Sequence, residues 1–275
     1  MQLFDILRSQ KMFCRNDSSV SYQTIFIQIC VLVICGMSLS TNAQGLKGFG
    51  LNRSRIVVME NVKGGAEVSV INNTDNVYLL QSRTFIADGV SGFPLIQSTE
   101  KPPFIVTPPL SRMDKNSRQS LRILVTPNNN MPSDRESLFY LMAKAIPSNP
   151  EKPDSDKDAV RKPQLLLALE QYVKLYYRPA SLNAHAILDG EVSEKLKFSL
   201  KNGRLHVSNP TPYYITFGLL KVNGKSVESS ELRKMISPKD QQDYLLPAGI
   251  SGVSVEWQII NEFGSMTDKA TQNIT

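Results

Sequence analysis

The sequence predicts an all-β protein made of two immunoglobulin-like β-sandwich domains. Short segments rich in β-branched and aromatic residues recur along the chain, and clusters of Gly, Asn and Asp separate them at the spacing of sandwich strands. No segment keeps a hydrophobic period of 3.6 residues, so we expect little helix. With 275 residues and a hydrophobic content of 41%, the chain can form two domains with their own cores.

The N-terminal region predicts a secretory signal. About fifteen apolar residues run from Ile25 to Leu39, and small residues follow up to Ala43. This run is shorter than the roughly twenty residues of a membrane-spanning helix, so we predict that residues 1–43 are a signal peptide. Met12 is a candidate start, because the segment before the apolar run is long. An uncleaved anchor is the alternative, but after cleavage we expect no stable membrane insertion.

The cysteines indicate how the mature chain is stabilised. Cys14, Cys30 and Cys35 all lie in or before the apolar run. Once the signal is removed, the chain has no disulfide, thiol nucleophile or thiolate metal site. Stability must then come from hydrophobic cores, which a chain of this size can supply.

Candidate strands between residues 44 and 179 match one immunoglobulin-like sandwich, the first predicted domain. They are Phe49–Met59, Ala66–Ile71, Val77–Ala87, Phe104–Val106, Ser120–Val125, Ser137–Ile146 and Leu165–Tyr177. Turn clusters separate them, among them Lys63–Gly65 and Asn72–Asn76. Pro179 ends the last strand, because proline cannot donate to a sheet ladder, and we place the domain boundary there.

Residues 180–275 contain a further set of strands and form the second predicted domain. The candidates are Lys195–Lys201, Arg204–Ser208, Tyr214–Leu220, Gln242–Leu245 and Val253–Ile260. The pairs Asn202-Gly203 and Asn223-Gly224 punctuate this region, and Asn-Gly is a strong signal for a two-residue hairpin turn.

One connection in the first domain is unusually long. The segment Pro147–Pro163 holds four prolines and eight charged residues between two candidate strands. Loops of this length are usually functional or disordered, and we expect this one to be mobile.

The strand after this loop has an alternating pattern. Leu165, Leu167 and Leu169 share one face, because side chains alternate across a strand. A buried central strand explains such leucines in an arbitrary sandwich. The long loop and the position at the end of the domain favour an edge strand instead, and an exposed apolar edge can pair with another chain.

Charge and motif content exclude several functions. The net charge is +6, but Lys and Arg form no run or stripe, so nucleic acid is not an expected partner. His185 and His206 are not at metal-ligand spacing, and no nucleophile elbow, phosphate loop or paired-carboxylate motif is present. We therefore expect no enzyme activity, no metal and no cofactor.

Five short segments form a specific combination. They are Asn52–Val57, Thr107–Leu110, Pro132–Tyr140, Lys174–Pro179 and Asn209–Tyr214. In this order they resemble signature motifs of the periplasmic pilus or fimbrial chaperones of the chaperone/usher pathway, the PapD-like family. The resemblance covers about residues 48–264.

The resemblance implies a function and an arrangement. Members of this family bind, fold and stabilise fimbrial subunits in the periplasm by donor-strand complementation, and deliver them to an outer-membrane usher. Their two domains form an L or boomerang whose cleft holds one incomplete subunit. For this chain the resemblance implies that Leu165, Leu167 and Leu169 are the donor strand. The rival hypothesis is a secreted structural or adhesive β-sandwich of a surface fibre, but the chain lacks the single incomplete domain expected of a subunit.

The resemblance also assigns two charged sites. It implies that Arg55 and Lys174 anchor the C-terminal carboxylate of the subunit, and that Glu136, Arg178 and Glu262 form a network between the domains. Relatives commonly carry Asp in place of Glu262. By residue type alone, Arg55 and Lys174 would be solvated surface charges. Lys174 also has the opposite parity to the three leucines, so a bulge, a twist or a long side-chain reach is required.

The long loop resembles that of a subclass that serves thin or capsule-like surface fibres. We expect this chain to belong to that subclass, although it lacks the disulfide that many of its members carry. Long-loop relatives also imply self-association of the free protein.

Overall fold

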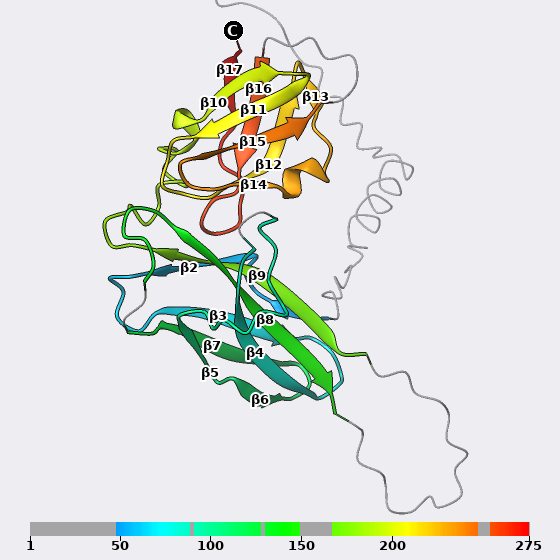
Figure 1. Cartoon of the computed structure of the whole chain (residues 1–275). Helices are drawn as coiled ribbons and strands as arrows, with labels where there is room; N and C mark the ends of the chain where they lie inside the picture. The colour runs from blue at the N-terminus through cyan, green and yellow to red at the C-terminus, as the bar shows by residue number, and fades with distance from the viewer. Residues whose placement is uncertain (1–47, 89–90, 128–129, 149–166, 247–253, 275) are drawn as a thin grey trace, which may run out of the picture. The chain divides into compact units, whose positions relative to one another are not determined.

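Figure 1 shows a computed structural model of the chain, which describes residues 48–88, 91–127, 130–148, 167–246 and 254–274. These residues belong to one compact unit, Gly45–Thr275. Nearly all of their regular structure is β-strand, and the helices among them are short 3-10 turns, Ser193–Lys195 and Glu231–Arg233. The all-β prediction is confirmed.

The first sandwich consists of two sheets packed on one core. One sheet has the order β1-β3-β7-β5, with β1 (Phe49–Leu51), β3 (Ala66–Asn72), β7 (Ser117–Val125) and β5 (Phe104–Thr107). The other has the order β2-β9-β8-β4-β6, with β2 (Arg55–Met59), β9 (Leu169–Arg178), β8 (Ser137–Pro147), β4 (Tyr78–Ile86) and β6 (Leu110–Met113). Buried side chains from both sheets fill the space between them, including Val68, Leu121, Leu80, Leu141 and Leu175.

The first predicted strand, Phe49–Met59, is divided between the two sheets. Strand β1 pairs antiparallel with β3, whereas β2 pairs parallel with β9. The chain leaves β3 after Asn52, whose N–H donates to the Ser69 carbonyl at 3.0 Å and whose side-chain oxygen accepts from the Ser69 N–H at 2.9 Å. Hydrophobic alternation does not reveal such a change of partner, so the prediction of one continuous strand is wrong.

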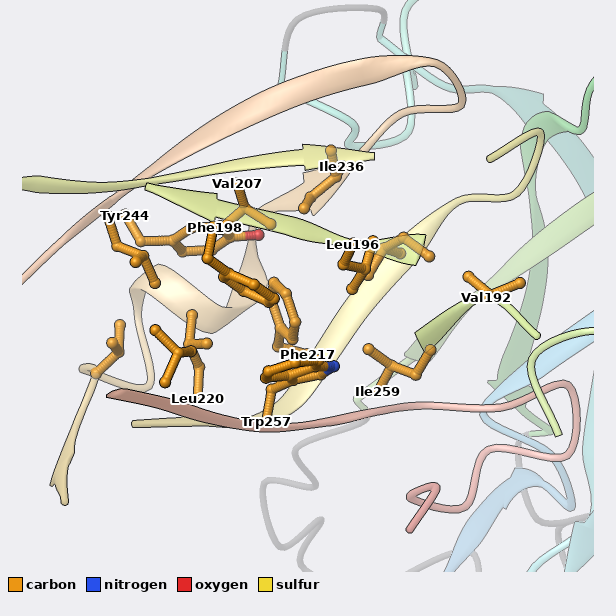
Figure 2. Close-up of a cluster of buried hydrophobic side chains, with 14 of the residues drawn as sticks. Val192, Leu196, Phe198, Val207, Phe217, Leu220, Ile236, Tyr244, Trp257 and Ile259 are labelled. Atoms are coloured by element: carbon orange, nitrogen blue, oxygen red, sulfur yellow. The ribbon is translucent and has the colours of Figure 1, made fainter. Parts of the chain in front are cut away.

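The second sandwich also has two sheets. One has the order β10-β11-β15; in the other β13-β12-β16-β17 are neighbours and β14 also pairs with β12. Their bounds are β10 (Lys197–Lys201), β11 (Arg204–Asn209), β12 (Ile215–Val222), β13 (Lys225–Ser226), β14 (Met235–Ile236), β15 (Asp240–Leu245), β16 (Ser254–Ile259) and β17 (Ala270–Asn273). Figure 2 shows the core of this sandwich, in which Phe198, Phe217 and Trp257 lie close together. The Trp257 indole N–H donates to the Ser193 hydroxyl at 2.9 Å, which satisfies its only donor in the core.

Both predicted Asn-Gly hairpins are confirmed. Asn202 and Gly203 connect β10 to β11, and Asn223 and Gly224 connect β12 to β13. All four residues have positive φ, between 47° and 74°, as a type I′ turn requires. The strands that the sequence pattern missed, β6, β13, β14 and β17, are each two to four residues long, too short to show a period.

Two predicted segments fall outside the described residues. One is the signal peptide, residues 1–43. The other is most of the Pro147–Pro163 loop, because the description stops at Ser148 and resumes at Leu167.

Candidate functional site

Two predicted site residues, Arg55 and Lys174, lie side by side. Arg55 begins β2, and the parallel register between β2 and β9 places it directly opposite Lys174. Arg55 is only 5% exposed, and Lys174 is partly buried. The expectation from residue type alone, solvated surface charges, is therefore wrong for this pair.

Groups of the second sandwich contact both cations. Arg55 Nη1 donates to the Ile260 carbonyl at 2.8 Å, and Lys174 Nζ donates to Thr216 Oγ1 at 3.4 Å. Neither cation forms an ion pair with a carboxylate in the described part of the chain. Arg55 Nε is buried there without a hydrogen-bond partner. Carbonyl and hydroxyl oxygens orient the two positive charges but do not neutralise them.

The electrostatics of the pair favour an anion. Burial, and then the positive charge of Arg55, lower the pKa of Lys174 to about 8. Tyr140 lies opposite Lys174 on β8, and burial raises the pKa of this phenol to about 12, so it is neutral at physiological pH. A carboxylate that entered between Arg55 and Lys174 would supply the missing negative charge through charge-assisted hydrogen bonds.

Strand β9 offers an open edge next to this pair. Strand β2 pairs only with Lys174–Arg178, so the segment Leu169–Val173 pairs with β8 alone among the described strands. Leu167 is 62% exposed and Leu169 is 46% exposed. A buried central strand is therefore the wrong interpretation for these two leucines. The third predicted donor residue, Leu165, lies outside the described residues.

Within the described part of β9, no β-bulge brings Lys174 onto the same face of the strand as the predicted donor leucines. The register of β9 against β8 runs without a break from Leu169 to Tyr177, so no bulge lies between Leu169 and Lys174. The side chains of these two residues therefore lie on opposite faces of the sheet. Val173, Leu175 and Tyr177 share the face of Leu169 and enter the core of the first sandwich.

The predicted charge network is present and buried. Arg178 Nε donates to Glu136 Oε1 at 2.8 Å, and Arg178 Nη1 donates to Glu262 Oε1 at 3.1 Å. The Arg178 side chain is 1% exposed, and both carboxylates are buried as well. The structure thus brings together three residues that are far apart in the sequence.

Backbone groups complete the network. They are the N–H of Tyr214 on Glu136, the N–H groups of Ile187 and Leu188 on Glu262, and the carbonyls of Asn183 and Ala184 on Arg178. Burial raises the pKa of Glu136 against the opposing charge of Arg178. Burial would lower the pKa of Arg178, but the two carboxylates outweigh it and raise that pKa, so the guanidinium stays charged.

Sequence reasoning missed the second-sandwich side of the site. Thr216 looks like any β-branched strand residue, and Ile260 contributes only its backbone carbonyl. A cavity of about 10 Å³, close to the size of one water, lies between Arg55 and the charge network; its lining includes Arg55, Arg178 and Glu262.

The described residues contain no cluster typical of a metal site and no apolar helix long enough to cross a membrane. No group of three or more His, Cys, Asp or Glu side chains among them is placed to hold a metal ion. Within the same residues, no helix has the length and apolar character needed to cross a membrane.

Family models match two consecutive parts of the chain. The model described as pili and flagellar-assembly chaperone, PapD N-terminal domain, matches residues 48–183. The model described as pili assembly chaperone PapD, C-terminal domain, matches residues 191–271.

Individual relatives match over nearly the same span. Chaperone protein FimC of Escherichia coli (strain K12) is 34% identical over 248 residues, 89% of this chain and 93% of that protein. Chaperone protein LpfB of Salmonella typhimurium is 33% identical over 248 residues, 89% and 96% of the two chains. A chain of the Salmonella enterica SafA pilin–SafB chaperone complex has a TM-score of 0.68 at 26% identity, over 84% of this chain and 98% of that one. The E. coli chaperone DraB has a TM-score of 0.65 at 29% identity, over 83% and 97%.

Proposed function

The chain belongs to the PapD-like family of pilus-assembly chaperones, and we propose that it holds fimbrial subunits by donor-strand complementation and passes them to an outer-membrane usher. One observation carries this proposal. The exposed edge at Leu167 and Leu169 runs toward a pair of cations, the buried Arg55 and the partly buried Lys174, that has no carboxylate partner among the described residues. An extended chain that ends in a carboxylate fits both features.

The edge supplies the affinity. Leu167 and Leu169 are 62% and 46% exposed, so burying what remains of each against a subunit contributes roughly half of the 1.5–3 kcal/mol of a fully exposed leucine, about 1 kcal/mol. Each new strand hydrogen bond along Leu169–Val173 adds about 0.5–1.5 kcal/mol net. Every described strand pairing of this segment is with β8, and β1 reaches it only through the Leu51 N–H, which donates to the Gln171 side chain at 2.8 Å, so its other backbone edge can accept a strand from the subunit.

The cation pair supplies the register. Five strand steps separate Leu169 from Lys174, or about 17 Å at ordinary strand rise. A carboxylate held at Arg55 and Lys174 fixes which subunit residues lie opposite the leucines, and a slip of one residue would present the wrong face. We propose a chaperone without enzyme activity, which the match to assembly-chaperone family models and relatives supports.

The remaining assignments of the chain belong to the same proposal. Residues 1–43 direct the chain to the periplasm, where fimbrial subunits emerge, and residues 44–179 and 180–275 are its two domains. Glu136, Arg178 and Glu262 hold these domains together, a role supported by their burial and mutual contacts.

Co-expression with fimbrial subunits tests the proposal. Arg55→Ala and Lys174→Ala are expected to lower the yield of soluble subunit strongly, because the carboxylate anchor is lost. Arg122→Ala is the matched control, since Arg122 is exposed on β7, away from the site. Unchanged subunit yield with both anchor variants would refute the anchor.

The leucines need a separate test. Changing Leu167 and Leu169 to Ser is expected to abolish the subunit complex and leave the chaperone folded, because both side chains are already exposed in the free protein. Unfolding of this variant would show instead that the leucines belong to the core.

A further inference from the structure

Two neighbouring residues of the second sandwich each contact one of the cations. Thr216 Oγ1 lies 3.4 Å from Lys174 Nζ, and the Ile260 carbonyl lies 2.8 Å from Arg55 Nη1. The two residues are joined to each other, because the Ile260 N–H donates to the Thr216 carbonyl at 2.9 Å. One hydrogen-bonded unit at the end of the β12–β16 pair therefore reaches both cations.

The Thr216 hydroxyl is fixed by its surroundings. Thr216 is buried at 7% exposure and lies opposite Met235 in the β12–β14 pair. The Met235 sulfur in turn accepts a weak hydrogen bond from the Tyr176 hydroxyl at 3.8 Å, and Tyr176 follows Lys174 by two residues on the same face of β9. Because Thr216 is buried, its hydroxyl has little room to turn away from Lys174.

The Ile260 carbonyl is fixed by the turn that follows it. The Asn261 N–H donates to the Ser265 carbonyl at 2.8 Å, and Glu262 in this turn binds Arg178. Gly264 has a φ of 87°, and any Cβ there would collide with the Ser54 side chain. The turn is thus held on one side by the charge network and on the other by the residue that precedes Arg55.

We propose that Thr216 and Ile260 are positioning residues that hold Lys174 and Arg55 in the orientation a subunit carboxylate requires. The inference rests on the proposed role of these cations as the carboxylate anchor. It makes the second sandwich part of the binding site, because long cationic side chains bind an anion more tightly when they are ordered beforehand. In this proposal the Glu136–Arg178–Glu262 network has a second role: it stabilises the turn that orients the Ile260 carbonyl.

A pair of peptides separates this role from mere structural support. The probe is a peptide of the last residues of a fimbrial subunit, made once with a free C-terminal carboxylate and once as the C-terminal amide. The ratio of the two affinities, measured by calorimetry, reports only the carboxylate contacts. Thr216→Val, which keeps the shape but removes the hydroxyl, is expected to lower this ratio by about threefold to tenfold, the effect of one ordinary hydrogen bond.

Matched variants give the controls. Thr216→Ser keeps the hydroxyl and should retain the wild-type ratio, and Thr271→Val changes an exposed threonine on β17 and should have no effect. In a Lys174→Ala background the Thr216→Val effect should disappear, because the two residues act on one contact. Melting temperatures of all variants show that they are folded.

The outcomes distinguish two failures. A wild-type ratio near one, or a ratio that Arg55→Ala leaves unchanged, overturns the anchor itself. A large ratio that Arg55→Ala removes but Thr216→Val leaves intact overturns only the positioning role. A ratio that falls equally in Thr216→Val and Thr216→Ser also overturns it, because the hydroxyl would then be irrelevant.

Discussion

Replacement of Glu136 by Ala should strongly destabilise the folded protein. Glu136 accepts hydrogen bonds from Arg178 Nε at 2.8 Å and from the Tyr214 N–H at 2.8 Å. Its removal leaves the buried Arg178 guanidinium with one carboxylate instead of two, and leaves the Tyr214 N–H without its acceptor. Removing one partner of a buried ion pair costs about 3–5 kcal/mol. We therefore expect the free energy of unfolding to fall by about that amount.

The same sequence segment offers a matched control. Asp134 also forms an ion pair with the second sandwich, through Lys239, but both side chains are exposed. Exposed ion pairs contribute little because water and salt screen them. Asp134→Ala should therefore leave the unfolding midpoint nearly unchanged, although it removes a carboxylate two residues away.

Urea unfolding measures the difference. Trp257, the single tryptophan, is buried in the second sandwich and reports its unfolding by fluorescence, while circular dichroism reports all strands. With a urea m-value of about 3 kcal/mol/M, near the upper end for small proteins, Glu136→Ala should lower the midpoint by about 1–2 M. If Glu136→Ala and Asp134→Ala shifted the midpoint equally, burial of the network would not determine its contribution to stability.

Two further predictions follow from the same contacts. Lys174 has a pKa near 8 and, in its proposed role, binds a carboxylate only while protonated, so affinity for a free-acid subunit peptide should be full below about pH 7 and fall roughly tenfold between pH 7 and pH 9. Calorimetry should show no such fall for the amidated peptide or for Lys174→Arg; a constant affinity of the free acid over this range would contradict the assignment. Gly264→Ala should lower the unfolding free energy by about 0.5–1.5 kcal/mol more than Gly190→Ala, because both glycines have positive φ but only at Gly264 must a neighbouring side chain, Ser54, change its rotamer. Equal losses in chemical denaturation would show that this close contact has no energetic role.

Most of the strands could be predicted from the sequence because strand formation depends on local residue chemistry. Residues 66–71 alternate and end in an Asn-rich turn, and β3 covers Ala66–Asn72. The division of Phe49–Met59 between two sheets could not be predicted. Its partners β3 and β9 are distant in the sequence, and local hydrophobic periodicity carries no information about strand partners.

The environment of the site was the least predictable part. Arg55 looks like a surface charge in its own segment, and its burial depends on a contact with Ile260, 205 residues later. The charge network was predicted through the family resemblance, and its members do meet. Thr216 was not predicted, since a threonine in a strand carries no signal that distinguishes a site residue from an ordinary one.

Arg55 and Lys174 hold two positive charges side by side, and their repulsion destabilises the free protein. Arg55 and Lys174 face each other across one strand pair, and burial and mutual repulsion keep the pKa of Lys174 near 8. If the pair binds carboxylates as proposed, a small carboxylate should reduce this repulsion and stabilise the folded state by mass action. On the proposed role of the pair, we expect acetate and citrate to compete weakly with a subunit carboxylate, so that affinities measured in such buffers should be lower than those measured in uncharged or cationic ones. The buffer anion should therefore be chosen with this site in mind, from purification to crystallisation.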